Sequence, residues 1–180
     1  MAFDDHIRPL LDTPEPPALG PGPRQSTESV AALEARLDGV LAQCDLSRER
    51  QALVKALVLL WHDHLEESHS LCQQIGSRDG SYVHGLMHRR EPDYGNAKYW
   101  FHKVGTHPSF EDLAARVNAQ LERRDADSLA KALLPSGRWD AFAMVDLCER
   151  AHRTDDSALE TSVIAIQALE FEVLLGYLGR

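Results

Sequence analysis

Histidine side chains at helical spacing are the residues in this sequence whose types best suit chemistry. His84 and His88 are four residues apart and Glu91 follows three residues later, so all three share one face of a helix. Neutral imidazoles bind metals and transfer protons near neutral pH. The zinc-protease motif is not present, because Gly85 stands where that motif has glutamate. We therefore expect a metal site or a proton-transfer pair at His84 and His88.

Other polar residues interrupt the apolar faces of two more expected helices. In the segment 47–75, His64 falls inside the apolar arc and His69 lies at its edge. In the last segment, Glu170 falls on the apolar side, where a buried carboxylate needs a cation, a metal or a proton. The alternative for Glu170 is the margin of a broad helix face. The candidate metal ligands are His64, His69, His84 and His88, and the candidate catalytic residues are His84, His88 and Glu170.

The same region also has the charge to attract an anion. Residues 81–107 contain four basic and two acidic side chains, a net charge of +2 in a chain whose total is −9. A locally positive patch on an acidic protein focuses small anions, and guanidinium forks bind carboxylate or phosphate. Either Arg89 or Arg90 is alternatively expected to form an ion pair with Glu91, Asp93 or Glu170. The candidate substrate-binding residues are Arg89, Arg90, Asn96 and Tyr99.

Two Glu-x-x-His pairs have the ligand spacing of di-iron helical bundles. Thirteen glutamates and nine histidines in 180 residues give about 0.65 such pairs by chance, from thirteen times nine divided by 180. Two pairs are therefore unremarkable. On the expected helix Glu66 also points away from the apolar face, so a di-iron site is a minor alternative.

Helical patterns dominate the elements that must position these residues. Apolar residues recur at three- and four-residue spacing after residue 25, and alternating strand patterns are scarce. We predict an all-α fold, a single compact domain over residues 26–180 with about six to eight helices. One long helix is expected over 47–75, Ser26 or Thr27 is expected to cap the first helix, and Ser109 with Asp112 forms a capping box.

The N-terminal 25 residues have a different composition. They hold six of the nine prolines and two glycines, which disfavours a helix and leaves little apolar surface to bury. We expect a Pro/Gly-rich arm or a disordered tail over residues 1–25. An arm that wraps around the domain is the minor alternative.

The overall composition excludes several classes of protein. Hydrophobic residues make up 43% and charged residues 26%, as in soluble globular proteins. The net charge of −9 argues against nucleic-acid or anionic-membrane binding. No segment has the length of a membrane span, and the N-terminus lacks signal-peptide features, so a cytoplasmic location is expected. Three cysteines without metal-ligand spacing argue against a disulfide framework.

One long block resembles a known family. The segments LWHDHLEESH and HGLMHRREPDYGNAKYWFHKVGTHP, with weaker similarity in WDAFAMVDLCE and QALEFE, resemble an uncharacterised protein family of bacteria and fungi. The family block has the form HGxMHRREPDxxNAxYWF, and the similarity covers about residues 60–110. An aromatic residue, commonly Trp, stands in that family where this chain has Val83, so a different pocket wall is expected there. The resemblance implies a shared fold and no mechanism.

Three functions are compatible with these residues. The first is a metal-assisted hydrolase that acts on a small anionic substrate with a divalent zinc, nickel, manganese or iron ion. Without a metal, a histidine beside Glu170 would be the general base. The second is a binding module for a small anion or a nucleotide, although no glycine-rich phosphate loop is present. The third is a structural or interaction protein whose polar block only stabilises the fold.

Overall fold

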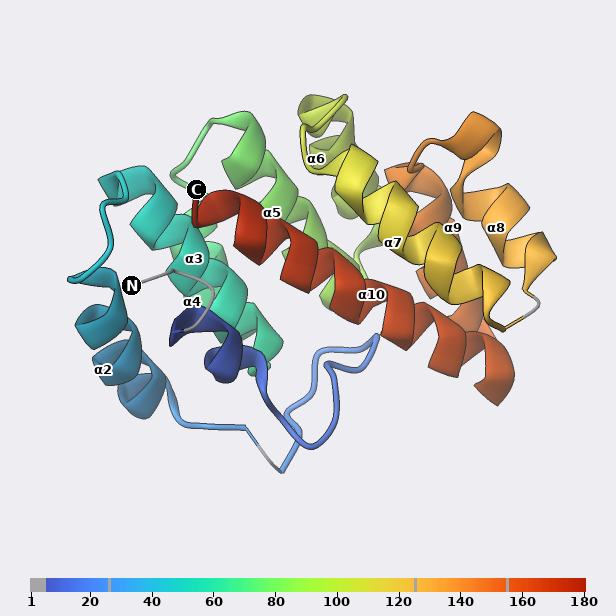
Figure 1. Ribbon diagram of the computed structural model, residues 1–180. Helices are drawn as coiled ribbons and strands as arrows, with labels where there is room; N and C mark the ends of the chain where they lie inside the picture. Colours follow the sequence, from blue (N-terminus) through green and yellow to red (C-terminus); the bar gives the residue numbers. More distant parts are fainter. Residues whose placement is uncertain (1–5, 26, 125, 155) are drawn as a thin grey trace.

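The computed structural model describes residues 6–25, 27–124, 126–154 and 156–180, and all regular structure in these ranges is helical. The all-α prediction is confirmed. Nine α-helices, labelled α2 to α10, are present in the described ranges together with two short 3-10 helices (Figure 1). The elements are η1 (Arg8–Leu11), α2 (Val30–Leu41), α3 (Arg48–Trp61), α4 (Leu65–Cys72), α5 (Arg78–Arg90), α6 (Tyr94–Val104), α7 (Phe110–Glu122), α8 (Asp127–Leu133), η2 (Pro135–Gly137), α9 (Ala141–Arg153) and α10 (Ser157–Leu178).

The segment expected to form one long helix over 47–75 is divided into α3 and α4. Asp63 lies between them with a left-handed φ of 66°, a conformation that aspartate tolerates better than most residues. Its carboxylate accepts hydrogen bonds from the backbone N and Nε of Arg24, at 2.8 and 2.9 Å, and from Nη2 of Arg90, at 2.7 Å. The prediction of a continuous helix was wrong because distant arginines, rather than a local glycine or proline, stabilise this break. The division also raises the helix number above the expected six to eight.

Helix α5 lies at the centre of the molecule and carries His84 and His88. Every residue from Gly80 to Arg90 is buried, and α5 packs chiefly against α6 and α4. Gly85 permits this packing because a Cβ at that position would lie 3.1–3.3 Å from three ring atoms of Phe101 on α6. The close approach brings the aromatic side chains of α6 against the histidines of α5.

Helix α10 crosses the molecule diagonally and contacts α3, α7 and α9 (Figure 1). Its apolar residues are buried around much of its circumference, and Gln167 and Glu170 are fully buried with them. No α-helix of the described part, α10 included, is both long and apolar enough to cross a membrane.

The N-terminal segment 6–25 packs against the helices. Gln167 donates hydrogen bonds to the carbonyls of Pro17 and Ala18, at 2.9 and 3.2 Å, and Arg90 donates to the Gly20 carbonyl at 3.0 and 3.1 Å. Gly22 has a φ of 80° and a Cβ there would lie 2.7 Å from Cγ of Asp63, so glycine allows this approach. In the described ranges the segment therefore wraps around the helices and buries more apolar surface than its composition suggested. Its buried apolar side chains are Ile7, Leu10, Leu11 and Leu19.

Two capping predictions differ from the structure. Ser29 caps α2 by accepting a hydrogen bond from the backbone N–H of Ala32, whereas Thr27 donates its hydroxyl to the Arg24 carbonyl; Ser26 lies outside the described residues. Ser109 precedes α7 but makes no capping hydrogen bond. Its hydroxyl lies 2.7 Å from Nδ1 of His107 instead, so a tertiary contact replaces the expected local one.

Candidate metal centre

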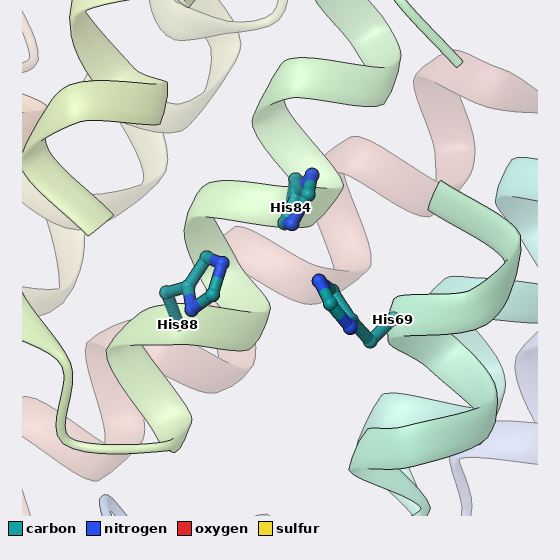
Figure 2. A group of neighbouring side chains, drawn as sticks. All are labelled: His69, His84 and His88. Atoms are coloured by element: carbon teal, nitrogen blue, oxygen red, sulfur yellow. The ribbon is translucent and has the colours of Figure 1, made fainter. Parts of the chain in front are cut away.

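Three histidines from two helices converge where α4 packs against α5, with His84 and His88 buried and His69 half-buried. His69 projects from α4 toward His84 and His88 on α5 (Figure 2). One potential ligand atom of each residue lies within 4.8 Å of the other two. The rings of His84 and His88 are nearly parallel, with centroids 4.8 Å apart, and the His69 ring lies edge-on to both, at 4.8 and 5.5 Å. We call these three residues the histidine cluster.

The dimensions of the histidine cluster fit a transition-metal site. In a tetrahedral zinc site with Zn–N bonds of about 2.0–2.1 Å, the ligand nitrogens lie about 3.4 Å apart. No pair of nitrogens is more than 4.8 Å apart, so they need to approach each other by about 1.4 Å at most. The nearly parallel rings of His84 and His88 must also rotate, because each imidazole lone pair lies in its ring plane and both have to point at one ion.

His84 lies at the centre of the cluster and has no hydrogen-bond partner among the described residues. Neither ring nitrogen has one, although the residue is only 3% exposed. Leaving a buried polar group unpaired costs about 1–3 kcal/mol, so such a group calls for a functional explanation. Its ring stacks on Trp100 at a centroid distance of 3.8 Å. The imidazole is thus held in place by packing, while its nitrogens are available to a ligand.

Electrostatics keep His84 in the form that binds metals. Burial lowers the pKa of His84 from 6.5 to about 3, and His88, His69 and Lys103 act in the same direction. The ring is therefore neutral at pH 7, and one nitrogen carries a free lone pair. A protonated imidazole has no such lone pair and cannot bind a metal.

His88 is oriented by two polar neighbours. Its Nδ1 lies 3.0 Å from Oε2 of Glu91, and its Nε2 lies 3.1 Å from Nδ2 of Asn96. An Nδ1–H that donates to Glu91 leaves a lone pair on Nε2, as in carboxylate–histidine–metal arrangements. Burial lowers the pKa of His88, and Glu91 opposes this shift. The Asn96 amide contacts the nitrogen that a metal would take, so it must move aside when a metal binds.

Two predicted site residues lie outside the histidine cluster. His64 immediately precedes α4, and its Nε2 lies 2.7 Å from the carbonyl oxygen of Glu28. Glu170 accepts a hydrogen bond from Nη2 of Arg89 at 2.6 Å and another from the Tyr82 hydroxyl at 3.0 Å. Both carboxylate oxygens of Glu170 are therefore engaged inside the core.

The predicted anion-binding residues are also dispersed. Arg89 forms the buried ion pair with Glu170, and Arg90 pairs with Asp63 and donates to the Leu60 carbonyl at 3.0 Å. Tyr99 is 57% exposed on α6. Of the four candidates only Asn96 contacts the histidine cluster, through His88. The ion-pair alternative considered for one arginine thus describes both.

The structure also contains a hydrogen-bond network around a histidine that the sequence did not predict. His107 Nε2 lies 3.0 Å from Oδ1 of Asp79, and His107 Nδ1 lies 2.7 Å from Oγ of Ser109. These are the residue types of a nucleophilic triad. The backbone N–H of Ser109 also donates to Nδ1 of His107, at 3.1 Å, and Ser109 is only 4% exposed. This hydrogen-bond network therefore stabilises the start of α7, and its buried serine is not presented as a nucleophile.

Trp100, which stacks on His84, is a neighbour of the cluster that sequence reasoning did not assign to it. The spacing of His84, His88 and Glu91 was the signal for the Glu91 contact. Comparisons with known proteins give no match, because no family model, curated protein or solved structure is significantly similar to this chain.

Proposed function

We propose that the histidine cluster binds a divalent transition metal, with zinc the first candidate, and that the protein is a metal-assisted hydrolase acting on a small anionic substrate. One observation carries the proposal. The two nitrogens of buried His84 have no hydrogen-bond partner in the described part of the chain, and one nitrogen lies within 4.8 Å of a nitrogen from each of two more imidazoles. Catalytic zinc sites commonly combine three protein ligands with one open position.

The ligand set favours particular metals. Three imidazole nitrogens suit zinc, nickel, copper and iron, whereas magnesium and calcium prefer oxygen ligands. This preference places zinc, nickel and iron ahead of manganese among the ions considered from the sequence. A zinc ion held there would supply Lewis-acid activation of a water molecule.

The chain's own residues have separate roles in the proposed site. Glu91 holds the Nδ1–H of His88, which orients Nε2 toward the cluster. Trp100 covers one face of His84 and excludes water from it. Asn96, once displaced from His88, has an amide N–H that can donate to the anionic part of a substrate. Glu170 is engaged by Arg89 and Tyr82, so it is not part of the proposed mechanism.

A second candidate function also has support from a specific observation. The guanidinium groups of Arg89 and Arg90 are fully buried in ion pairs with Glu170 and Asp63. This favours a structural or interaction protein in which the arginine-rich block stabilises the fold. The histidine cluster would then link α4 to α5 without turnover.

Metal titration of protein prepared without a histidine tag tests the proposal. We expect Zn²⁺ to bind with one-to-one stoichiometry in calorimetry, and Co²⁺ to give the intense visible absorption of a tetrahedral site. His84→Ala and His69→Ala should each weaken zinc binding at least tenfold. The control is His102→Ala, because His102 is exposed on α6 and lies outside the cluster.

The metal site and the hydrolase activity are tested separately. Absence of one-to-one binding, or equal loss of affinity in the His102→Ala control, refutes the metal site. Hydrolysis of p-nitrophenyl esters and phosphates is then compared in zinc-loaded, metal-stripped and His84→Ala protein. Tight metal binding without metal-dependent turnover of any ester or phosphoester refutes the hydrolase and supports the structural alternative.

A further inference from the structure

A wide groove is lined by the end of α6, the first half of α7, η2 and the start of α9. Its volume is about 1470 Å³, and none of the three clustered histidines lines it. Aromatic side chains form part of its wall, and one of them, Phe142, is 41% exposed. The groove is thus a separate surface, with apolar area open to a ligand.

Three cations line this groove, namely Arg78, Lys103 and Arg138. None of them forms an ion pair with any residue in the described part of the chain. Nζ of Lys103 also lies 4.1 Å from the centroid of the Trp100 ring, a cation–π contact that leaves the lysine charged. Unpaired cations gathered on one groove of a chain with net charge −9 favour an anionic partner.

The two carboxylates that line the groove have other roles. Oδ1 of Asp140 accepts the backbone N–H groups of Phe142 and Ala143 at 2.9 and 3.0 Å, which caps α9. Glu111 lies in the first turn of α7, where the helix dipole favours a negative charge. Neither carboxylate pairs with the three cations in the described structure, and the five charged side chains together give the wall a net charge of +1.

The wall also has an unusual backbone conformation. Ser136 has a left-handed φ of 55°, which is uncommon for serine, and such strained residues concentrate at binding sites. Ser136 lines the groove.

We propose that this groove binds an extended acidic peptide segment of a partner protein. Carboxylates of the peptide would contact Arg78, Lys103 and Arg138, and an apolar side chain would pack on Phe142. The volume exceeds the range of about 300–1,000 Å³ that is usual for small-molecule sites, which favours a peptide. Charge complementarity at such an interface chiefly sets the partner and the association rate.

Fluorescence anisotropy with two labelled peptides tests the proposal. The first is a ten-residue glutamate-rich peptide with one central phenylalanine, and the second has lysine at every glutamate position. We expect the acidic peptide to bind and the basic peptide not to bind. The double variant Lys103→Glu with Arg138→Glu should weaken binding at least tenfold, and Phe142→Ala should weaken it less.

The matched control is Arg123→Glu with Arg124→Glu, because both arginines are exposed and lie outside the groove. It changes the net charge by the same amount and should leave the affinity within about twofold of wild type. Equal loss in this control, equal binding of the basic peptide, or no binding of the acidic peptide overturns the proposal. Complete displacement of the peptide by millimolar citrate or phosphate also overturns it, because the groove would then take a small anion.

Discussion

Replacing Glu170 by glutamine tests whether the buried carboxylate is a stabilising partner of Arg89. The two side chains are 0% and 1% exposed, and Oε2 lies 2.6 Å from Nη2. Burial acts to lower the pKa of Arg89, but the Glu170 carboxylate overcomes this effect and raises it. The guanidinium therefore keeps its charge in the core, and glutamine leaves that charge uncompensated.

The expected loss of stability is large. Breaking a buried ion pair by removing one partner costs about 3–5 kcal/mol. A folded domain has a free energy of unfolding of about 5–15 kcal/mol, so a large share would be lost. With a urea dependence of about 2 kcal/mol per M, the unfolding midpoint should fall by about 1.5–2.5 M. The Tyr82 hydroxyl can still donate to the amide oxygen of glutamine, which keeps the effect within this range.

Urea unfolding at pH 7, followed by far-ultraviolet circular dichroism, measures the change. The matched control is Glu172→Gln, because Glu172 lies on the same helix, is half-buried and makes no ion pair in the described part of the chain. It should change stability by less than about 0.5 kcal/mol. A double variant, Arg89→Met with Glu170→Leu, should recover stability because no uncompensated charge remains.

Two outcomes would refute the reasoning about this pair. One is a Glu170→Gln protein whose stability lies within about 0.5 kcal/mol of wild type. The other is a double variant no more stable than the single one, which would mean that the charge of Arg89 is not the source of the loss.

Three further predictions concern the N-terminal segment and the central helix. Asp63→Asn weakens the contacts with Arg24 and Arg90, so we expect the free energy of unfolding measured in urea to fall by about 3 kcal/mol. Proteolysis of residues 6–25 should also become faster, and unchanged proteolysis would contradict this prediction. Burial lowers the pKa of His62 in the folded protein below the unfolded value of about 6.5. The stability that neutral His62 contributes is therefore complete above about pH 6.5 and is lost as the pH falls below it. Urea midpoints of His62→Gln should therefore decline less than those of wild type between about pH 6.5 and 5, and superimposable profiles would exclude His62. In Gly85→Ala, contact of the new Cβ with the buried Phe101 ring at 3.1 Å should cost about 1–3 kcal/mol, outweighing a helix-propensity gain of about 1 kcal/mol; an unchanged Tm would show that the ring moves freely.

The sequence by itself determined the helical class and the pairing of His84 with His88. Both follow from spacing between residues close in the chain, because a helix repeats every 3.6 residues wherever it lies. Gly105 ends α6 and Pro92 follows α5, so several helix ends were also local properties. The helical pattern also placed Glu170 on the apolar face of its helix, and the residue is fully buried.

Tertiary structure alone decided which polar groups meet. Asp63 pairs with Arg90, 27 residues away, and this contact stabilises the break that separates α3 from α4. A single helix over residues 47–75 would have placed His69 at the edge of the apolar face. The break changes the direction in which the His69 side chain points. Arg89 and Glu170 are 81 residues apart, and their ion pair takes both out of the predicted site. Periodicity assigns a side chain to a buried face, but its partner depends on how the helices pack, since the charge of a buried group is stabilised only by the group that lies against it.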